Sequence, residues 1–347
     1  MVYKMSELSI EEVLHFAQEA YSEAAVVDIE QLAQAGSDRI YYRIKNGADR
    51  SIIATQSANV EENERFILLA NYFENKEIPV PVILAIHPDK SLYLQDDAGT
   101  DCLLDVVLQE GHTEAVKELY KQVLSQLVQI QLCAKDKKFS ELFNVLPSFG
   151  YDQILFDLRY FKNNFASKSE VAFDEDKLEK EFDALAKSLD KEKGYFMYRD
   201  CQGRNIMVQE KEIVFIDFQG GLQGHPVYDV ASLLWQAKAK IPTIWKKDLV
   251  TFYLEQFKNA ADQMGLEIDL ALWEADYNML TLTRLLQVLG AYGLRGLIEG
   301  KEHFISSIPL GLQNIHEWLQ VNTLDTYPEL MQVLEQISQE DFIEKFK

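Results

Sequence analysis

Short β-like stretches of apolar residues, separated by polar and turn residues, recur in the first hundred positions of the chain. Five of them predict β-strands, at residues 26–32, 39–44, 51–56, 82–86 and 92–95. Apolar residues recur at helical spacing in two further segments, residues 9–21 and 60–75, which predicts two helices. Turn residues at 35–38 and 46–49 separate consecutive strands, and the second turn predicts a hairpin loop. The pattern therefore indicates a small β-rich unit with two helices.

The pattern becomes mostly helical beyond residue 101. Apolar residues at helical spacing predict long helices at 113–134, 151–165, 174–189, 243–264, 270–298, 303–321 and 328–346. Short β-like stretches interrupt them at 195–198, 206–208 and 213–217. We therefore expect two parts, residues 1–97 and residues 98–347, and a chain of 347 residues is long enough for both.

Composition and charge exclude several classes of function. The chain has 34 Lys and Arg against 56 Asp and Glu, which gives a formal charge of −22 and disfavours nucleic acid or an anionic membrane as a partner. The three cysteines have no metal-type spacing and suit a reducing compartment. The chain begins without the pattern of a signal peptide, and no apolar run approaches the length of a membrane span. We expect a soluble cytoplasmic protein, and its oligomeric state stays open.

Three oxygen-bearing side chains stand at informative spacing between residues 195 and 217. Asp200 follows a short predicted strand, Asn205 comes five residues later, and Asp217 ends the next pair of predicted strands. A carboxylate on such a loop can accept a hydroxyl proton, while an amide and a second carboxylate supply the hard oxygen ligands that Mg²⁺ prefers. Together these groups are the parts that phosphoryl transfer needs.

The amino-acid sequence around these residues resembles that of a known family. The stretches RDCQGRNIMV, FIDFQGG and YDVASLL are similar to the catalytic and metal-binding loops of the aminoglycoside phosphotransferase and choline kinase family, within the protein-kinase-like superfamily. The closest likeness is to bacterial kinases that phosphorylate the anomeric hydroxyl of N-acetylmuramate and N-acetylglucosamine. The resemblance implies an α+β, bilobal protein-kinase-like fold, with an antiparallel sheet and one main helix in the N-lobe and a larger, mostly helical C-lobe. It also implies ATP and Mg²⁺ as cofactors.

The resemblance assigns roles to the residues of these loops. Asp200 is the expected base, and Asn205 and Asp217 are the expected Mg²⁺ ligands. Asp229 is expected to brace the catalytic loop, although a carboxylate there could also cap a helix that begins near Val230. Arg204, beside the metal-binding asparagine, is expected to contact phosphate.

The nucleotide-binding residues depart from the family pattern. The strand at 51–56 reads SIIATQ and lacks the phosphate-binding lysine of protein kinases. We expect Arg39 or Arg43 to replace it, because a guanidinium binds phosphate bidentately, and Glu64 to orient that arginine unless Glu61 or Glu62 does so. The backbone N–H groups of Ser37 and Asp38 are expected to reach phosphate oxygens. Adenine is expected to hydrogen-bond to the backbone of the hinge, near Gln95, Asp96 and Asp97.

The acceptor is expected to bind over the helical part, facing Asp200. The candidates are polar side chains near the catalytic loop or on the helix predicted at 270–298, namely Gln202, Gln219, Tyr228, Arg284 and Gln287. Glycines 290, 293 and 296 on that helix each cost about 1 kcal/mol relative to Ala. Either close helix packing or a bound ligand accounts for them.

The sequence favours an ATP- and Mg²⁺-dependent kinase that acts on a small hydroxyl-bearing molecule, most specifically an N-acetylated amino sugar. One alternative keeps the chemistry but uses a cationic alcohol, such as an aminoglycoside or choline. Another is a catalytically silent nucleotide-binding module, which the missing lysine would suit. Carboxylates facing Asp200 would favour a cationic acceptor, and amides would favour a neutral or anionic sugar. Only eleven residues separate Asp217 from Asp229, too few for the activation segment of a protein kinase.

Overall fold

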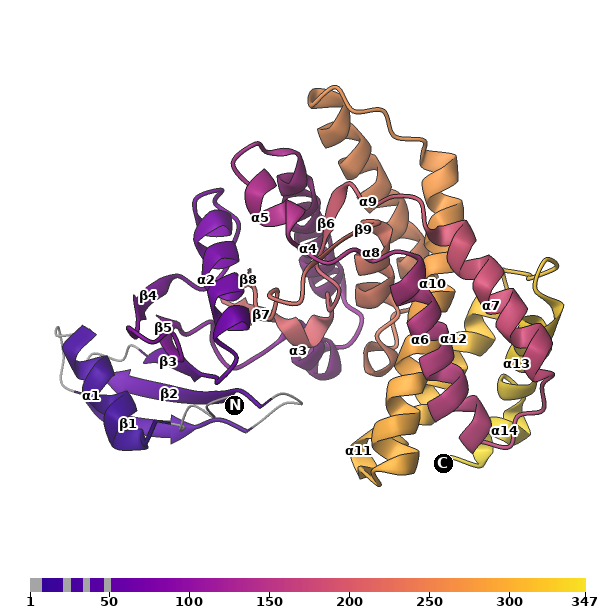
Figure 1. Ribbon diagram of the computed structural model, residues 1–347, viewed down its shortest axis with the longest axis horizontal. Coiled ribbons are helices and arrows are strands. Elements are labelled where there is room, and N and C mark those ends of the chain that lie inside the picture. Colours follow the sequence, from indigo (N-terminus) through magenta and orange to yellow (C-terminus); the bar gives the residue numbers. More distant parts are fainter. Residues whose placement is uncertain (1–7, 21–25, 34–37, 47–50) are drawn as a thin grey trace, which may run out of the picture. The chain divides into compact units, whose positions relative to one another are not determined.

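The chain divides into two compact units in the computed structural model (Figure 1), which describes residues 8–20, 26–33, 38–46 and 51–347. The first unit takes residues up to Leu103 together with Asn205–Gly220, and the second takes Leu104–Arg204 and Gly221–Lys347. The hairpin loop predicted at 46–49 lies largely outside the described residues. The nucleotide-clamping and catalytic roles expected for residues 1–97 and 98–347 stay predictions.

A five-stranded antiparallel sheet forms the centre of the first unit, in the order β1-β2-β3-β5-β4. Its strands are β1 (Val26–Gln31), β2 (Ile40–Asn46), β3 (Ser51–Gln56), β4 (Ile83–Ile86) and β5 (Leu92–Asp96). The unit also contains α1 (Ile10–Ala20), α2 (Val60–Glu74) and the hairpin of β7 (Ile206–Gln209) and β8 (Glu212–Phe215). All five strands of the predicted sheet are present.

The two faces of this sheet differ in character, because successive side chains of a strand point to opposite sides. On one face, Val13 and Ala17 of α1 pack against apolar residues of three central strands, namely Tyr42, Ile44, Ile52, Ala54, Leu92 and Leu94. On the other face, Tyr93 stacks on Phe66 of α2, with ring centroids 5.4 Å apart. The helix α1 therefore covers an apolar core on one face of the sheet, and α2 lies on the opposite face, to which Tyr93 belongs.

The second unit is mostly helical. Its helices are α3 (Leu103–Glu110), α4 (Glu114–Leu132), α5 (Ser140–Asn144), α6 (Tyr151–Asn164), α7 (Glu175–Leu189), α8 (Val227–Leu234), α9 (Thr243–Gln263), α10 (Leu270–Tyr292), α11 (Glu302–Ile305), α12 (Ile308–Leu319), α13 (Pro328–Ile337) and α14 (Glu340–Glu344). Two short strands, β6 (Tyr195–Met197) and β9 (Leu222–Gly224), pair beside them. Short 3₁₀ turns at Cys133–Lys135, Ala166–Lys168, Gly203–Asn205 and Ala237–Ala239 join the longer elements, and Gly293–Ile298 is π-helical.

Close packing of α10 and its π-helical extension against neighbouring helices explains the glycines of this segment. A Cβ atom on Gly290 would lie 2.9 Å from the backbone nitrogen of Phe161, and one on Gly293 would lie 2.2 Å from the carbonyl oxygen of Asn164. Gly296 similarly faces Ile305, at 3.1 Å. Of the two explanations weighed for these glycines, the structure supports close helix packing.

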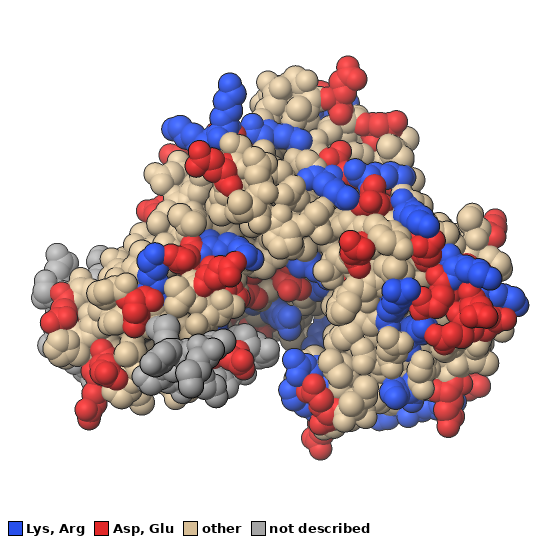
Figure 2. Space-filling model, viewed as in Figure 1, with Lys and Arg blue, Asp and Glu red and all other residues tan. Residues whose placement is uncertain are grey.

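Charged side chains of both signs lie on the face of the molecule that Figure 2 shows. On that face, acidic and basic side chains lie side by side (Figure 2). Among the ion pairs of the helical unit, Lys162 pairs with Glu175 and Glu179. The charge of −22 is therefore not gathered into one patch on that face. No helix among the described residues is long and apolar enough to span a membrane.

Candidate active site

The loop that carries Asp200 is fixed by a carboxylate buried in the second unit. Asp229 accepts hydrogen bonds from the backbone N–H groups of Tyr198 (2.8 Å) and Arg199 (2.9 Å) and from the amide of Gln131 (2.9 Å). Burial raises its pKa to about 6, although these three donors favour the ionised form. Asp229 therefore holds the backbone of the loop. It is not a helix cap, because α8 begins at Val227, with Pro226 at the cap position.

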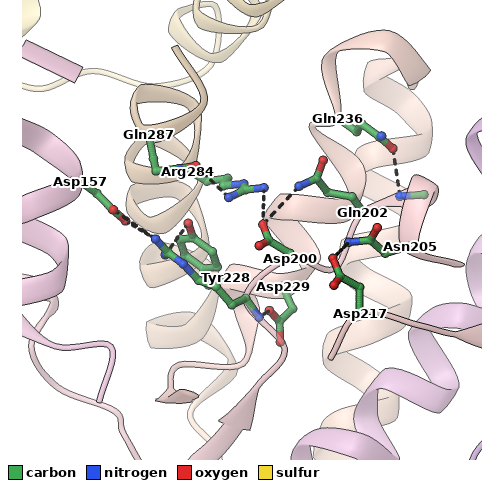
Figure 3. A network of polar contacts seen from close by, with 12 residues as sticks. Asp157, Asp200, Gln202, Asn205, Asp217, Tyr228, Asp229, Gln236, Arg284 and Gln287 are labelled. Carbon is green, nitrogen blue, oxygen red and sulfur yellow. Dashed lines mark hydrogen bonds and ion pairs between the residues drawn. The ribbon is translucent and has the colours of Figure 1, made fainter. Parts of the chain in front are cut away.

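Arg199 anchors the same loop through its side chain. Its guanidinium pairs with Asp157 of α6 at 2.8 Å and donates to the hydroxyl of Tyr228 at 2.7 Å (Figure 3). It also lies over the Phe149 ring. Tyr228 is fully buried in this arrangement. The structure therefore gives Tyr228 a supporting role in place of the acceptor contact that the sequence suggested, since its ring and hydroxyl are enclosed by protein.

Asp200 is accessible, and a buried arginine faces it. Its side chain is 47% exposed, while that of Arg284 is only 5% exposed and lies 3.3 Å from the Asp200 carboxylate. Arg284 is held in turn by Gln287, whose side-chain oxygen accepts a hydrogen bond at 2.8 Å, and Gln202 donates to Asp200 at 3.4 Å. The structure thus brings four of the predicted residues together, from the loop and from α10 (Figure 3).

The surrounding charges keep Asp200 ionised. Burial of its environment would raise the pKa of the Asp200 carboxyl, but the positive charges of Arg284, Arg199 and Arg204 outweigh that effect and hold the pKa below its ordinary value. Arg204 itself is exposed, in the 3₁₀ turn that follows. Asp200 is therefore a carboxylate able to orient a hydroxyl or accept its proton at any pH near neutrality.

Asn205 and Asp217 meet at one end of the β7–β8 hairpin in the first unit. The backbone carbonyl of Asn205 accepts from the N–H of Ile216 at 3.1 Å, which closes the hairpin. The side-chain amide of Asn205 then lies 3.3 Å from the Asp217 carboxylate (Figure 3), and the amide of Gln219 lies 2.7 Å from its other oxygen. Gln219, expected at the acceptor, is thus placed beside a metal-binding candidate.

Aromatic stacking ties Asp217 to α2. The next residue, Phe218, stacks on Phe66 with ring centroids 4.6 Å apart and meets Phe73 edge-on at 5.4 Å. Asp217 itself has a φ of +67°, a conformation that residues other than glycine rarely adopt. Packing on both sides of Phe218 therefore holds a strained backbone in place, as is common at functional sites.

The donor set of this pair fits Mg²⁺. A carboxylate and an amide oxygen are hard ligands, and Mg²⁺ commonly takes only one or two protein ligands and completes its shell with phosphate and water. In the part of the chain that the structure describes, no group of three or more His, Cys, Asp or Glu residues could hold a metal by itself. A Mg²⁺ ion held by Asn205 and Asp217 would take its remaining ligands from phosphate and water.

The two candidate arginines of the first unit have different surroundings. Arg43 donates two hydrogen bonds to Asp97, at 2.6 and 3.0 Å, and one to the carbonyl of Gly99. Arg39 is 4% exposed and lies 3.3 Å from Glu62 of α2. Glu64 pairs with Lys90 and Glu61 pairs with Arg65, so Glu62 is the one of these three glutamates that meets a candidate phosphate-binding arginine.

The other residues predicted to contact the nucleotide differ in their surroundings. Ser37 lies outside the described residues, and Asp38 is exposed. Gln95 is buried within β5, while the backbone N–H of Asp96 donates to Val82. Asp97 is engaged by Arg43, by the Ser51 hydroxyl and by the N–H of Gly99. Its side chain therefore stabilises the end of the sheet, and the N–H of Asp96 is already occupied.

Two supporting residues are not indicated by the sequence, and a third is indicated only as an alternative. Gln131, Asp157 and Glu62 support Asp229, Arg199 and Arg39, respectively. Gln131 and Asp157 lie on helices far along the chain from their partners, so no local spacing indicates them. Glu62 was named only as a competitor of Glu64, and its place in the capping box of α2 was the available signal.

Known proteins resemble the chain in sequence and in structure. Residues 28–265 match the sequence pattern of a protein family described as "Phosphotransferase enzyme family". An N-acetylmuramate/N-acetylglucosamine kinase of Pseudomonas aeruginosa is 24% identical over 313 residues, which cover 85% of this chain and 84% of that protein. A protein of the same name from Neisseria meningitidis is 26% identical over 238 residues, covering 67% of this chain and 68% of that protein.

A solved structure of choline kinase from Cryptosporidium parvum superposes with a TM-score of 0.61 at 12% identity, covering 90% of this chain and 97% of that one. The structural likeness confirms the predicted fold class, and the family match confirms the predicted resemblance.

Proposed function

The chain belongs to the phosphotransferase enzyme family, and from that premise we propose that it transfers the γ-phosphoryl group of ATP, with Mg²⁺, to a hydroxyl group of an N-acetylated amino sugar. The enzyme is a small-molecule kinase. The curated relatives from Pseudomonas aeruginosa and Neisseria meningitidis, named for N-acetylmuramate and N-acetylglucosamine, support the choice of acceptor.

The observation that carries the choice of acceptor is the buried arginine beside Asp200. Arg284 lies 3.3 Å from the carboxylate, and the amides of Gln202 and Gln287 complete the contacts of this group in the helical unit. The nearby carboxylate of Asp157 is neutralised by Arg199. A cationic aminoglycoside or choline would face a positive charge here, whereas a neutral or anionic sugar would find hydrogen-bond donors.

Asp200 acts as the base in the proposed mechanism. Its carboxylate accepts the proton of the sugar hydroxyl while the hydroxyl oxygen bonds to the γ-phosphorus and the bond from that phosphorus to the β-γ bridging oxygen breaks, so ADP leaves. A carboxylate with a lowered pKa is a weak base, which suits the anomeric hydroxyl because it is more acidic than the other sugar hydroxyls. We place the transfer at that position.

Asn205 and Asp217 hold Mg²⁺ in this proposal. When bound, the ion neutralises charge on the phosphates. Five residues separate Asp200 from Asn205, so the chain itself keeps the base and the metal ligand within about 18 Å of each other. Catalysis would then consist mainly of positioning and charge neutralisation.

The test is an acceptor panel with ATP and Mg²⁺, in which ADP release is measured with N-acetylmuramate, N-acetylglucosamine, glucose, choline and kanamycin. We expect turnover with the two N-acetylated sugars to exceed turnover with the other three by at least about 100-fold. Preference for kanamycin or choline would move the proposal to the cationic alternative. Nucleotide binding without turnover of any acceptor would favour the silent module. The expected cytoplasmic location stays a prediction.

A further inference from the structure

The polar face of the sheet in the first unit contains buried groups without partners. Tyr41 pairs in register with Thr55, and Thr55 with Tyr93, so these three side chains form a row across β2, β3 and β5. Arg39 immediately precedes β2, shares a side-chain hydrogen bond with Tyr41 and lies beside Tyr93. Within the described residues, the Thr55 hydroxyl and two nitrogens of Arg39 are buried without a hydrogen-bond partner. The opposite face of the sheet is apolar.

Arg39 is the most costly of these groups to leave unpaired. Its Nη2 atom lies 3.3 Å from Glu62 but is not aligned for a hydrogen bond, and its Nε atom likewise has no hydrogen-bond partner among the described residues. Buried charges in proteins are normally paired and hydrogen-bonded, because desolvation is otherwise uncompensated. A guanidinium buried in this way indicates an anionic ligand.

Glu62 orients Arg39 without satisfying its hydrogen bonds. One carboxylate oxygen of Glu62 accepts from the side chain of Asn59, the N-cap of α2, and the other faces Arg39. The hydrogen bond from Asn59 thus fixes the side-chain conformation of Glu62, and Glu62 in turn fixes the orientation of the Arg39 guanidinium. The Nε and Nη2 donors of Arg39, which lack hydrogen-bond partners among the described residues, can together bind two oxygens of a phosphate group.

The surroundings of Arg39 identify the anion. Tyr93 stacks on Phe66, and Phe66 stacks on Phe218, the residue after the proposed metal ligand Asp217. Tyr41 and Tyr93 also interact electrostatically with both Arg39 and Asp217. Arg39 and the metal-binding pair therefore belong to one cluster within the first unit. An anion that meets both a guanidinium and a Mg²⁺ site is a nucleoside di- or triphosphate.

We propose that Arg39, oriented by Glu62, is the side chain that binds the nucleotide phosphates, in place of the lysine that β3 lacks. This inference rests on the proposed function, because it requires ATP as the donor. Arg43 does not share the role, since its hydrogen bonds go to Asp97 and Gly99. The two arginines, four residues apart, therefore form a matched pair for experiment.

The test compares Arg39→Met with Arg43→Met in calorimetric titrations with ADP plus Mg²⁺ and with adenosine. We expect Arg39→Met to weaken ADP binding by about 10- to 100-fold, the range for a lost charge-assisted hydrogen-bonded contact, and to leave adenosine binding within twofold of the parent. Arg43→Met should keep the parent's ratio of ADP to adenosine affinity. A merely structural role of Arg39 would weaken both ligands equally.

Arg39→Lys covers the case in which Arg39→Met does not fold. It keeps the charge but loses the bidentate geometry, so ADP binding should weaken by several-fold and adenosine binding should not change. Unchanged ADP affinity in either folded variant, or parallel losses for the two ligands, would overturn the inference. A parent protein that binds neither ligand would overturn the proposed function as well, and the two failures are thereby distinguished.

Discussion

At the scale of single residues, the candidate site places strained backbone next to its functional groups. Arg199, which precedes Asp200, has a φ of +76°, and Asp217 has a φ of +67°. Such conformations cost on the order of 1–3 kcal/mol each. Asp229 offsets the first through two backbone hydrogen bonds, and the stacking of Phe218 offsets the second. The site is thus held by its surroundings and not by the local preference of the loop.

Arg284 is expected to set the ionisation and the position of Asp200. Replacing it with Met removes the largest charge effect that lowers the pKa of Asp200, so that pKa should rise. Because the base must be ionised, the acid limb of the pH profile of kcat/KM should move to higher pH, and kcat should fall by about 10-fold or more. The measurement is steady-state kinetics between pH 4 and 8.

Arg295→Met is the matched control, because Arg295 is exposed and its side chain pairs with Glu299. We expect its pH profile to coincide with that of the parent. An Arg284→Met variant that folds and keeps the parent's acid limb would contradict the role given to Arg284.

At this scale the sequence indicated the candidate reacting groups more clearly than the residues that support them. The spacing of Asp200, Asn205 and Asp217 indicated a chemistry, because those residue types in that order have few other uses. Their supports, such as Gln131 and Asp157, come from helices distant in sequence, and only the folded chain brings them close. Tyr228 was misjudged for the same reason, since its burial depends on Phe149 and Arg199.

At the scale of elements, short β-like stretches bounded by turn residues predicted the strands of the sheet, and helical periodicity predicted the long helices. Short elements were missed, because α3, α5 and β9 span too few residues for a period to be seen. The helix predicted at 303–321 is divided after Ile305, and α12 begins at Ile308 with Pro309 in its first turn, where the missing N–H of proline is tolerated. Interruptions of a helix of this kind depend on tertiary packing.

The contact between α6 and α10 is expected to depend on Gly293. Alanine raises intrinsic helix stability by about 1 kcal/mol, but its Cβ would lie 2.2 Å from the carbonyl oxygen of Asn164, so the clash should decide the sign. We expect Gly293→Ala to lower the free energy of unfolding by about 1–3 kcal/mol, measured by urea denaturation. Gly220→Ala has open space around its Cβ and should stay within about 0.5 kcal/mol of the parent. Equal free energies of unfolding for the two variants would show that the backbone at Gly293 does not approach Asn164 of α6 as closely as the structure indicates.

At the scale of the whole molecule, the two units carry different parts of the proposed chemistry. Asn205, Asp217 and Arg39 belong to the first unit, and Asp200, Arg284 and Gln287 belong to the second. The division falls between Arg204 and Asn205, inside the 3₁₀ turn that follows the base. Binding of the nucleotide and binding of the acceptor should therefore respond to different substitutions.

Asp217→Ala tests this separation. It removes a proposed Mg²⁺ ligand from the first unit, so ADP affinity should lose its dependence on Mg²⁺. Affinity for N-acetylglucosamine, measured without nucleotide, should stay within twofold of the parent. Both are measured by calorimetry, with and without EDTA. An unchanged Mg²⁺ dependence of ADP binding would remove Asp217 from the metal site.

The most direct test of the central claim is to follow, by ³¹P nuclear magnetic resonance, the phosphate product formed from ATP, Mg²⁺ and N-acetylmuramate or N-acetylglucosamine, with the parent protein and with Asp200→Asn. The account predicts a sugar phosphate resonance with the parent, and a rate of formation at least about 100-fold lower with a folded Asp200→Asn variant. A sugar phosphate formed equally fast by both proteins, or by neither, would contradict it.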